Sequence, residues 1–393
     1  MTRTLLLCSR PPWPLTGGDR LRAFMVARAL STLGPVDLVA TRGPEEAEET
    51  IRAGLPFIDR LRLPVLHRTA AAGRVVRAAA RGGLLQQALY DDRGARQATA
   101  ELIRDADVVV AHLVRTVPWL PADRPPLIVD IQDALSAQYH AASGRARGWR
   151  GAAARVEARR IDAAERAACA AADVVSFISA RDRDLVLDRL PVRRRAVVAR
   201  AALDPQRHPA PPDGPRTGVV FAGNLRTASN RAMAELLALR VWPIVRSVHR
   251  SAELRIVGVE AAAGVRALGR RPGVTFVGPV DDMNHALAGA VATACPLEFG
   301  SGVQNKILES LAAETPVVLT PPAAAALGTP GGAGTGLDVA RLRRPFAERL
   351  VHLLSSPEKA RRRGIEGRQW VTARHDPETA LAPLLQAVED LSG

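Results

Sequence analysis

The sequence predicts an α/β protein with two doubly wound, Rossmann-like domains that face a central cleft. Its 393 residues exceed the size at which one hydrophobic core stops growing, and 47% of them are hydrophobic. Strand-like and helix-like stretches alternate, as in a parallel sheet with helices on both faces, and the alternation restarts after a proline-rich break. We therefore expect an N-terminal domain at 1–202, a linker at 203–216, a C-terminal domain at 217–375, and a C-terminal helix at 376–393 that packs back toward the N-terminal domain.

Short apolar runs predict the strands of the first domain, and apolar residues at helical spacing predict the helices between them. Apolar positions recur at this spacing in residues 20–33, and the longest helix is expected at 148–172. The predicted strands of this domain are Thr4–Ser9, Val36–Ala40, Arg60–Val65, Asp107–His112, Pro126–Ile131, Val174–Ile178 and Ala196–Ala199.

The second domain shows the same alternation, and the chain ends in two or three helices, the last at Pro377–Leu391. Its predicted strands are Val219–Ala222, Leu254–Val257, Val274–Val277, Val291–Leu297 and Pro316–Leu319. Its predicted helices are Asn230–His249, Glu260–Leu268, Met283–Ala288 and Val303–Ala313.

The formal net charge of +14 favours anionic partners, namely nucleic acid, a membrane surface or phosphorylated substrates. Aromatic residues make up only 4% of the chain, and no basic-aromatic pattern indicates base stacking, so nucleic acid is disfavoured. The basic stretches Arg68–Arg81 and Arg145–Arg200 belong to the first domain, and the former has an amphipathic pattern. It could rest on an anionic membrane, or form solvated helices packed on the sheet. A coding bias toward arginine accounts for the charge equally well.

No apolar run reaches the ~18 residues needed to span a membrane, and the apolar start is too short for a signal peptide. Cys8, Cys169 and Cys295 lie far apart without metal-ligand spacing, which indicates buried, reduced thiols. We therefore expect a cytoplasmic protein, with peripheral contact at the inner membrane face as an option, and no metal site.

Three predicted strand ends in the second domain carry a glycine, at Gly223, Gly258 and Gly278. Glycine permits a tight turn and the close approach of a ligand. A fourth strand leads into Gly300-Ser-Gly302, directly before an expected helix. The free N–H groups and dipole at that helix N-terminus predict a phosphate site.

Lysine occurs only at Lys306 and Lys359, and all the other basic residues are arginines. Gly302, Lys306, Glu309 and Ala313 fall at i, i+4, i+7 and i+11, on one face of the expected helix. A lysine there would neutralise a diphosphate, and a carboxylate one turn further could accept two hydrogen bonds from a ribose diol. The alternative is a Lys–Glu pair on a solvated face, which stabilises a helix by about 0.2–0.5 kcal/mol.

The stretch Gly-Ser-Gly-Val-Gln-Asn-Lys-Ile-Leu-Glu-Ser-Leu-Ala-Ala-Glu-Thr-Pro-Val-Val at 300–318 resembles the nucleotide-sugar domain of GT-B glycosyltransferases, specifically the retaining family 4. Phe221-Ala-Gly-Asn-Leu225 and Phe276-Val-Gly-Pro-Val280 are similar to that family too. The loop from Arg10 to Arg22 resembles the first loop of a branch of sugar transferases linked to exopolysaccharide systems.

The resemblance implies a metal-independent enzyme with no required cofactor that transfers a hexosyl or related sugar, with retention, from a nucleoside diphosphate. The acceptor would be a lipid-linked glycan or a small-molecule aglycone on the first domain. Glu309 would bind the ribose, Val280 would lie near the base, and Gly17 and Gly18 would face the donor phosphates. Groups at Ser301, Gly302 and Val303, with Gly300 and Gly223 beside them, would face the diphosphate or donor sugar.

The chain departs from the family pattern at several places. Many members have a Glu at the place of Ser301, an Arg at that of Asn224 and a Lys near Asn230. Lys306 and Arg226 are therefore our candidates for compensating charge, and Lys306 is the leading catalytic candidate. Glu298, three residues before Ser301, is an additional donor-binding candidate.

Many members also carry a His after the strand at 126–131, where this chain has Asp130-Ile-Gln-Asp133. We take Asp133 and His112 as further catalytic candidates, although a histidine at the edge of the core is an equal interpretation of His112. These departures keep two alternatives open. One is a catalytically degenerate GT-B binding protein, and the other is a nucleotide-sugar epimerase, which would need an acid/base pair in the cleft.

Overall fold

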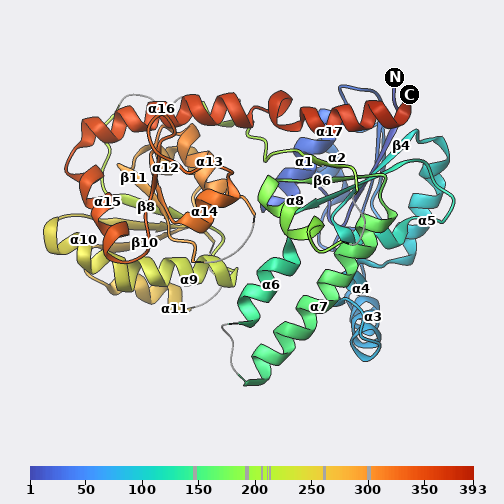
Figure 1. Cartoon of the computed structure of the whole chain (residues 1–393), viewed down its shortest axis with the longest axis horizontal. Coiled ribbons are helices and arrows are strands. Elements are labelled where there is room, and N and C mark those ends of the chain that lie inside the picture. The colour runs from blue at the N-terminus through green and yellow to red at the C-terminus, as the bar shows by residue number, and fades with distance from the viewer. Residues whose placement is uncertain are drawn as a thin grey trace. The chain divides into compact units, whose positions relative to one another are not determined.

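The computed structural model describes residues 1–144, 148–190, 194–204, 207–209, 211, 214–259, 263–298 and 302–393. The chain divides into two compact units, Met1–Ala202 together with Ala380–Gly393, and Leu203–Thr379 (Figure 1). The described residues of the first unit hold a seven-stranded sheet and those of the second a six-stranded sheet, and every pairing between the strands of each sheet is parallel. The predicted class of two Rossmann-like α/β domains is confirmed.

The sheet of the first unit has the strand order β3-β2-β1-β4-β5-β6-β7. Each residue of β1, β2 and β4 is buried, because helices cover both faces of a parallel sheet. The strand order reverses beside β1, and ligands of such sheets bind outside the carboxyl ends of the strands at that point. The strands are β1 (Thr4–Cys8), β2 (Val36–Ala40), β3 (Arg60–Arg62), β4 (Val108–His112), β5 (Leu127–Gln132), β6 (Val174–Phe177) and β7 (Ala196–Val198).

The last helix of the chain, α17 (Pro377–Ser392), packs into the first unit from Ala380 onward. Its Leu381, Leu384 and Val388 are fully buried in the cluster that contains Leu6 of β1, and Arg200 N donates to Ala380 O over 2.9 Å. The other helices of this unit are α1 (Gly18–Leu30), α2 (Glu48–Ala53), α3 (Arg68–Ala80), α4 (Leu85–Tyr90), α5 (Arg93–Leu102), α6 (Leu135–Ser143), α7 (Gly148–Ala171) and α8 (Ala180–Leu187).

The sheet of the second unit has the order β10-β9-β8-β11-β12-β13. Its strands are β8 (Val219–Ala222), β9 (Leu254–Val257), β10 (Val274–Gly278), β11 (Ala292–Cys295), β12 (Val317–Leu319) and β13 (Leu337–Val339). Its helices are α9 (Ala228–Leu236), α10 (Trp242–Val248), α11 (Ala263–Arg266), α12 (Met283–Ala288), α13 (Asn305–Ala312), α14 (Pro321–Ala326), α15 (Arg344–Leu354) and α16 (Pro357–His375).

The structure corrects two local predictions and adds one strand. The helix predicted at Asn230–His249 is interrupted by a π-helical turn, Leu237–Val241, because Pro243 has no N–H with which to continue the regular ladder. Strand β3 ends at Arg62 rather than Val65, since Pro64 cannot donate to a sheet. Strand β13 was not predicted, because it has only three residues and directly follows the glycine-rich stretch 331–336.

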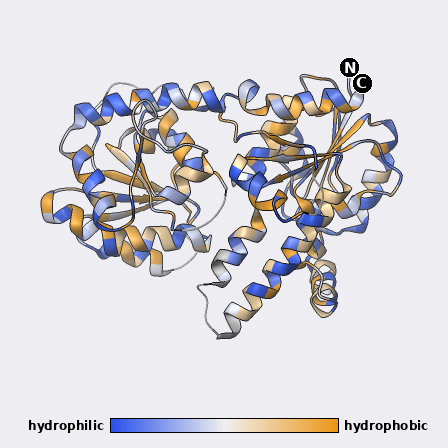
Figure 2. Ribbon diagram, viewed as in Figure 1, coloured by the Kyte–Doolittle hydropathy of each residue, from blue (hydrophilic) through white to orange (hydrophobic). Residues whose placement is uncertain are grey.

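Figure 2 shows that the strands of each sheet are mostly hydrophobic, whereas the helices alternate between hydrophobic and hydrophilic residues. All three cysteines are buried and free, as predicted. In the part of the chain that the structure describes, no helix is both long enough and apolar enough to cross a membrane.

Candidate functional site

The carboxyl ends of β8, β9 and β10 meet through their glycines. Gly223 N donates to Val257 O over 3.0 Å, and Gly258 N donates to Gly278 O over 2.7 Å. Gly258 has a φ of +142°, and a Cβ atom there would lie 1.9 Å from Gly223 O. Because no side chain fits this contact, the three strand ends form a smooth backbone edge that a ligand can approach closely.

Lys306 of α13 lies against this edge. Its Nζ donates a 2.6 Å hydrogen bond to Asn230 Oδ1 and sits 4.4 Å from the ring centroid of Phe221, and a Cβ on Gly223 would lie 3.0 Å from Nζ. Only 7% of the residue is exposed, and burial lowers the pKa of its ammonium. The second unit therefore holds a buried cation beside its strand-end glycines, which is a favourable place for an anion.

Glu309 lies one turn beyond Lys306 and is half-buried. Burial raises the pKa of its carboxyl group, and the positive charges of Lys306 and Arg207 act in the opposite direction. Its carboxylate makes no hydrogen bond or ion pair with the described residues, so both oxygens are available to a ligand.

The start of α13 corrects one prediction. The helix begins at Asn305 rather than Val303, with Gln304 at its N-cap, because Gly302 adopts a left-handed φ of 87°. Gly302 and Val303 consequently lie in the preceding loop, and Gly302 does not share a helical face with Lys306. The predicted donor residues Gly300 and Ser301 lie outside the described residues.

The loop after β8 is organised by two asparagines. Asn224 Oδ1 accepts from Arg226 N over 3.0 Å, and Asn224 O accepts from Asn230 Nδ2 over the same distance. Asn230 thus joins this loop to Lys306. The side chain of Arg226 is exposed and forms no ion pair within the described residues.

The structure describes no contact between the remaining donor candidates of the second unit, Glu298 and Val280, and either Lys306 or Glu309. Glu298 is exposed just after β11. Val280 packs against the apolar cluster of Val220, Val257 and Leu287. Asp282 caps α12 by accepting from His285 N over 2.9 Å.

In the first unit, a buried polar network lies at the carboxyl ends of β4 and β5. Asp130 accepts from Arg22 at 3.2 and 3.0 Å, from Ser176 Oγ at 2.9 Å, and pairs with His112 Nδ1 at 3.0 Å. Burial alone would raise the pKa of Asp130, but Arg22 and His112 outweigh it and hold that pKa well below its usual range. His112 is only 2% exposed, and its Nε2 has no partner among the described residues.

Sequence reasoning missed this network and its neighbour Gln132. Two non-glycine residues have a left-handed φ at the carboxyl ends of these neighbouring strands. They are Leu113 (69°), directly after β4, and Gln132 (67°), the last residue of β5. Gln132 Oε1 is buried without a partner in the described part of the chain. Such strain is typical of functional sites. The sequence signal that could have revealed this network is a polar residue near the end of each of two apolar strands. His112 and Asp130 are these residues, and they lie opposite each other in the paired strands.

Asp133 follows β5 and is half-buried. Burial raises its pKa to about 7, and the carboxylates of Asp182 and Asp130 add to the shift. Its Oδ1 is buried without a partner among the described residues. A carboxyl group that titrates near neutral pH can hold or accept a proton, which is the property required of a general acid or base.

The predicted glycine pair lies at the start of α1. Gly17 has a φ of 111° and precedes the helix, whose first residue is Gly18. Asp19 in the first turn pairs with Arg10 and, over 3.4 Å, with Arg115, so two guanidinium groups lie beside the N-terminus of this helix. Among the described residues, no group of three His, Cys, Asp or Glu side chains could hold a metal ion.

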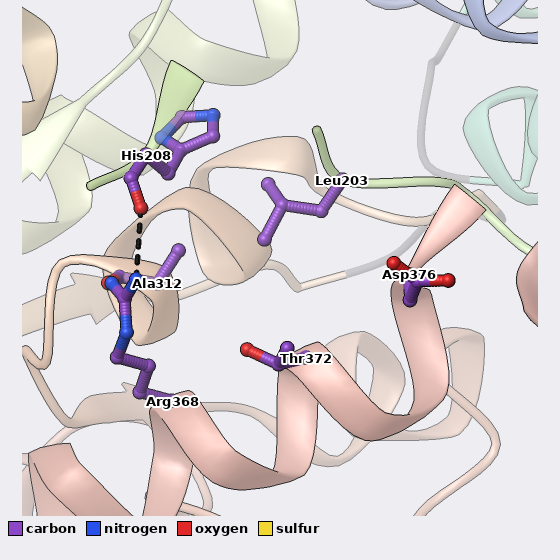
Figure 3. Close-up of a pocket in the computed structure, with 6 residues that line it drawn as sticks. All are labelled: Leu203, His208, Ala312, Arg368, Thr372 and Asp376. Carbon is purple, nitrogen blue, oxygen red and sulfur yellow. Dashed lines mark hydrogen bonds between the residues drawn. The ribbon is translucent and has the colours of Figure 1, made fainter. Parts of the chain in front are cut away.

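A small pocket in the second unit lies between the end of α13 and helix α16 (Figure 3). Arg368 Nη2 donates to His208 O over 3.1 Å across it. None of the residues predicted to bind a donor lines this pocket, so it is not our candidate site. Its lining consists of Leu203, His208, Ala312, Arg368, Thr372 and Asp376.

Residues 216–356 match a family model described as glycosyl transferases group 1. This range contains the glycine edge, Lys306 and Glu309. No curated protein has a sequence that matches the chain significantly.

Several solved structures share the fold over nearly the whole chain. Sucrose-phosphate synthase from Thermosynechococcus elongatus superposes with a TM-score of 0.73 at 15% identity, with 99% of each chain covered. TarM from S. aureus, in a mutant form in complex with fondaparinux, α-GlcNAc-glycerol and UDP, gives 0.71 at 10% identity, covering 99% of this chain and all of that one. HepE from Anabaena in complex with UDP gives 0.63 at 15% identity, with 99% and 100% covered. The chain thus has the GT-B fold, and the group 1 domain within it supports a GT-B glycosyltransferase.

Proposed function

We propose that this protein is a retaining, metal-independent glycosyltransferase of family 4. It moves a hexosyl or related sugar from a nucleoside diphosphate to an acceptor that binds on the first unit. The observation that carries the proposal is that a buried Lys306 and an available Glu309 carboxylate lie one helical turn apart on α13, beside the glycine edge of the group 1 domain.

In this proposal Lys306 binds the donor diphosphate. The bond between the anomeric carbon and the diphosphate oxygen breaks, and its electron pair leaves with the diphosphate. The acceptor oxygen bonds to the same carbon, and its proton passes to the leaving diphosphate. An ammonium shielded from water stabilises this developing charge more strongly than an exposed one, because the local dielectric is low.

Glu309 binds the ribose in the same scheme. Two neighbouring hydroxyl groups of the ribose would each donate to one carboxylate oxygen, and hydrogen bonds to an ionised acceptor are the stronger class. The contact requires the ionised carboxylate, which the nearby charges of Lys306 and Arg207 favour. Because HepE and TarM were solved with UDP, we propose uridine diphosphate sugars as the first donors to test.

The first unit would supply the acceptor side. His112 Nε2, Gln132 Oε1 and Asp133 Oδ1 are buried polar atoms without partners in the described residues, at the ends of neighbouring strands. Buried polar atoms cost free energy unless a partner satisfies them, so hydroxyl groups of a sugar acceptor are suitable partners. Gly17 and Gly18 would face the donor phosphates from this unit.

One observation favours a second candidate function, a binding protein that has lost catalysis. The ammonium of Lys306 already has Asn230 as an acceptor, and the Arg and Lys expected near positions 224 and 230 are both asparagines. The same experiment separates the two functions, because a binding protein retains nucleotide but releases no nucleoside diphosphate from a sugar donor.

The test is a thermal-shift series with UDP, GDP, dTDP and ADP and their sugars, followed by an assay for released nucleoside diphosphate. Ligand that binds the native state alone raises the melting temperature. The rise should be selective for one base, absent in Glu309→Ala and intact in Glu235→Ala, a matched control on the exposed side of α9. Absence of a shift with every nucleotide would contradict the donor site itself.

A further inference from the structure

We propose that the outward faces of α3 and α7 form a docking surface for a bilayer of anionic phospholipids. We call this surface the basic platform, and it consists of Val76, Arg77, Arg81, Arg155, Val156 and Arg159. The proposal goes beyond sugar transfer, because it concerns a surface outside the candidate donor and acceptor sites.

The first step is the position of the platform. Helices α3 and α4 follow β3, and helices α6 and α7 follow β5. Both pairs of helices therefore leave the sheet from the carboxyl ends of its parallel strands. Figure 1 shows α3, α4, α6 and α7 extending beyond the sheet of the first unit. His112 and Asp133 lie at the same carboxyl edge. A surface held by these helices therefore belongs to the edge at which an acceptor would bind.

The second step is that the four helices form one body. Arg160 Nη2 on α7 donates to Ala79 O on α3 over 3.2 Å. Gln86 Nε2 on α4 donates to Tyr139 OH on α6 over 3.5 Å. The first bond ties the end of α3 to the middle of α7, and the second ties α4 to α6, so α3 and α7 lie side by side.

The third step is the charge of the platform. Helix α3 has no Asp or Glu. Arg77, Arg81, Arg155 and Arg159 are exposed and form no ion pair with the described residues.

Other arginines on these helices form ion pairs within the protein. Arg74 pairs with Asp92 over 3.5 Å, and Arg160 pairs with Glu157 over 3.6 Å. The positive charge of the platform is consequently uncompensated, while the acids around it are already engaged.

The fourth step is the apolar component. Val76 is 68% exposed and Val156 is 47% exposed, and both belong to the small set of large hydrophobic residues exposed in the described chain. The exposed face of α3 continues with small residues, Ala72, Gly73 and Ala80. An uncompensated basic face with exposed valines can sink shallowly into the headgroup region while its arginines pair with lipid phosphates.

This composition favours a bilayer over a nucleic acid. A surface that binds single strands presents aromatic side chains on which bases stack, and the platform has none. Exposed valines gain nothing from a phosphate backbone, whereas the acyl boundary of a bilayer removes them from water.

The experiment is sedimentation of the full chain with vesicles of phosphatidylcholine, with and without phosphatidylglycerol, at low and high salt. We expect binding only to vesicles with phosphatidylglycerol, weakened by salt. Arg77→Glu/Arg155→Glu should weaken it about tenfold or more, since each arginine near an anionic surface strengthens binding about fivefold. The matched control, Arg270→Glu/Arg271→Glu, changes the net charge equally on exposed residues of the second unit and should bind normally.

Val76→Asp tests the apolar component and should reduce binding at a given salt concentration. The nucleotide-induced thermal shift should be unchanged in all these variants, which separates this proposal from that of the donor site. Equal losses in the platform variant and its control would overturn the proposal, as would a lack of binding to phosphatidylglycerol vesicles. Retention of an RNA or DNA oligonucleotide through Arg77 and Arg155, without vesicle binding, would also overturn it.

Discussion

Lys306 Nζ donates a 2.6 Å hydrogen bond to Asn230 Oδ1, a partner 76 residues earlier in the chain. The bond holds an almost fully buried cation against Gly223 and the ring of Phe221. A neutral amide oxygen is a weak partner for a buried ammonium, so an incoming diphosphate can replace it with a gain in free energy. The predictions about the donor site follow from this relationship.

Replacing Lys306 with Ala should lower kcat with a UDP-sugar donor by about 100-fold, the loss typical of one group that stabilises the leaving charge. Thermal stability should change little, because burial of an ammonium offsets the loss of its hydrogen bond. Steady-state kinetics and a melting curve measure both. Lys359→Ala, which removes the only other lysine, is exposed and should behave as the wild type. Unaltered turnover in Lys306→Ala would refute the diphosphate role.

Replacing Glu309 with Gln should raise the donor KM by about 10- to 100-fold, because hydrogen bonds to a charged group contribute roughly 1.5–3 kcal/mol. Turnover at saturating donor should fall less, since the ribose lies away from the reacting carbon. Glu235→Gln supplies the control. An unchanged KM would exclude Glu309 from the ribose contact.

Donor affinity should also depend on pH through Glu309. Burial raises the pKa of this carboxyl group above 4.5, so it takes up a proton at a higher pH than an ordinary glutamate. Affinity should therefore be full at neutral pH and fall as the pH drops through the raised pKa. Titration calorimetry with UDP at several pH values measures this, and Glu309→Gln should remove that part of the pH dependence. A pH dependence that persists in the variant would assign it to another group.

Asp133 should make the protein less stable at alkaline than at acidic pH. Its pKa is about 7 in the folded protein against 3.8 ordinarily, so between these values the native state holds a proton that the unfolded state has lost. The stability that this proton contributes is fully present below pH 3.8 and is lost as the pH rises toward 7.

Asp133→Asn should consequently raise the unfolding free energy at pH 8 by about 1–3 kcal/mol over wild type, and by little at pH 4. Denaturant titrations at both values measure the difference. Asp123→Asn, at an exposed position of the same unit, should show no such pH-dependent gain. A gain of equal size at both pH values would mean that packing rather than ionisation is responsible.

The contributions of Arg22 and Asp130 to the free energy of unfolding should depend on each other. Asp130→Asn or Arg22→Met alone should each cost about 3–5 kcal/mol, because either leaves a buried charge without its counter-ion. The double variant should cost clearly less than the sum, which denaturant titration of the full cycle measures. Additive losses would show that the two charges do not interact energetically.

The sequence predicted most strands to within one or two residues, because a strand buried on both faces must be an uninterrupted apolar run. It predicted the glycine positions of β8, β9 and β10 for a similar local reason, since a strand end that needs a close backbone contact excludes side chains. It failed where local signals conflict. The glycines before β13 concealed a strand, and Pro243 turned a periodic helical stretch into two helices joined by a π turn.

The candidate site shows the same division. Composition made Lys306 conspicuous, and helical periodicity placed Glu309 one turn from it, so the sequence by itself determined both candidates and the α/β class. Only the tertiary structure paired Lys306 with Asn230, His112 with Asp130, and the end of α3 with α7. Periodicity specifies which face a residue occupies on its own element, whereas partners distant in sequence are fixed by how the strands and helices pack, and no local pattern encodes that arrangement.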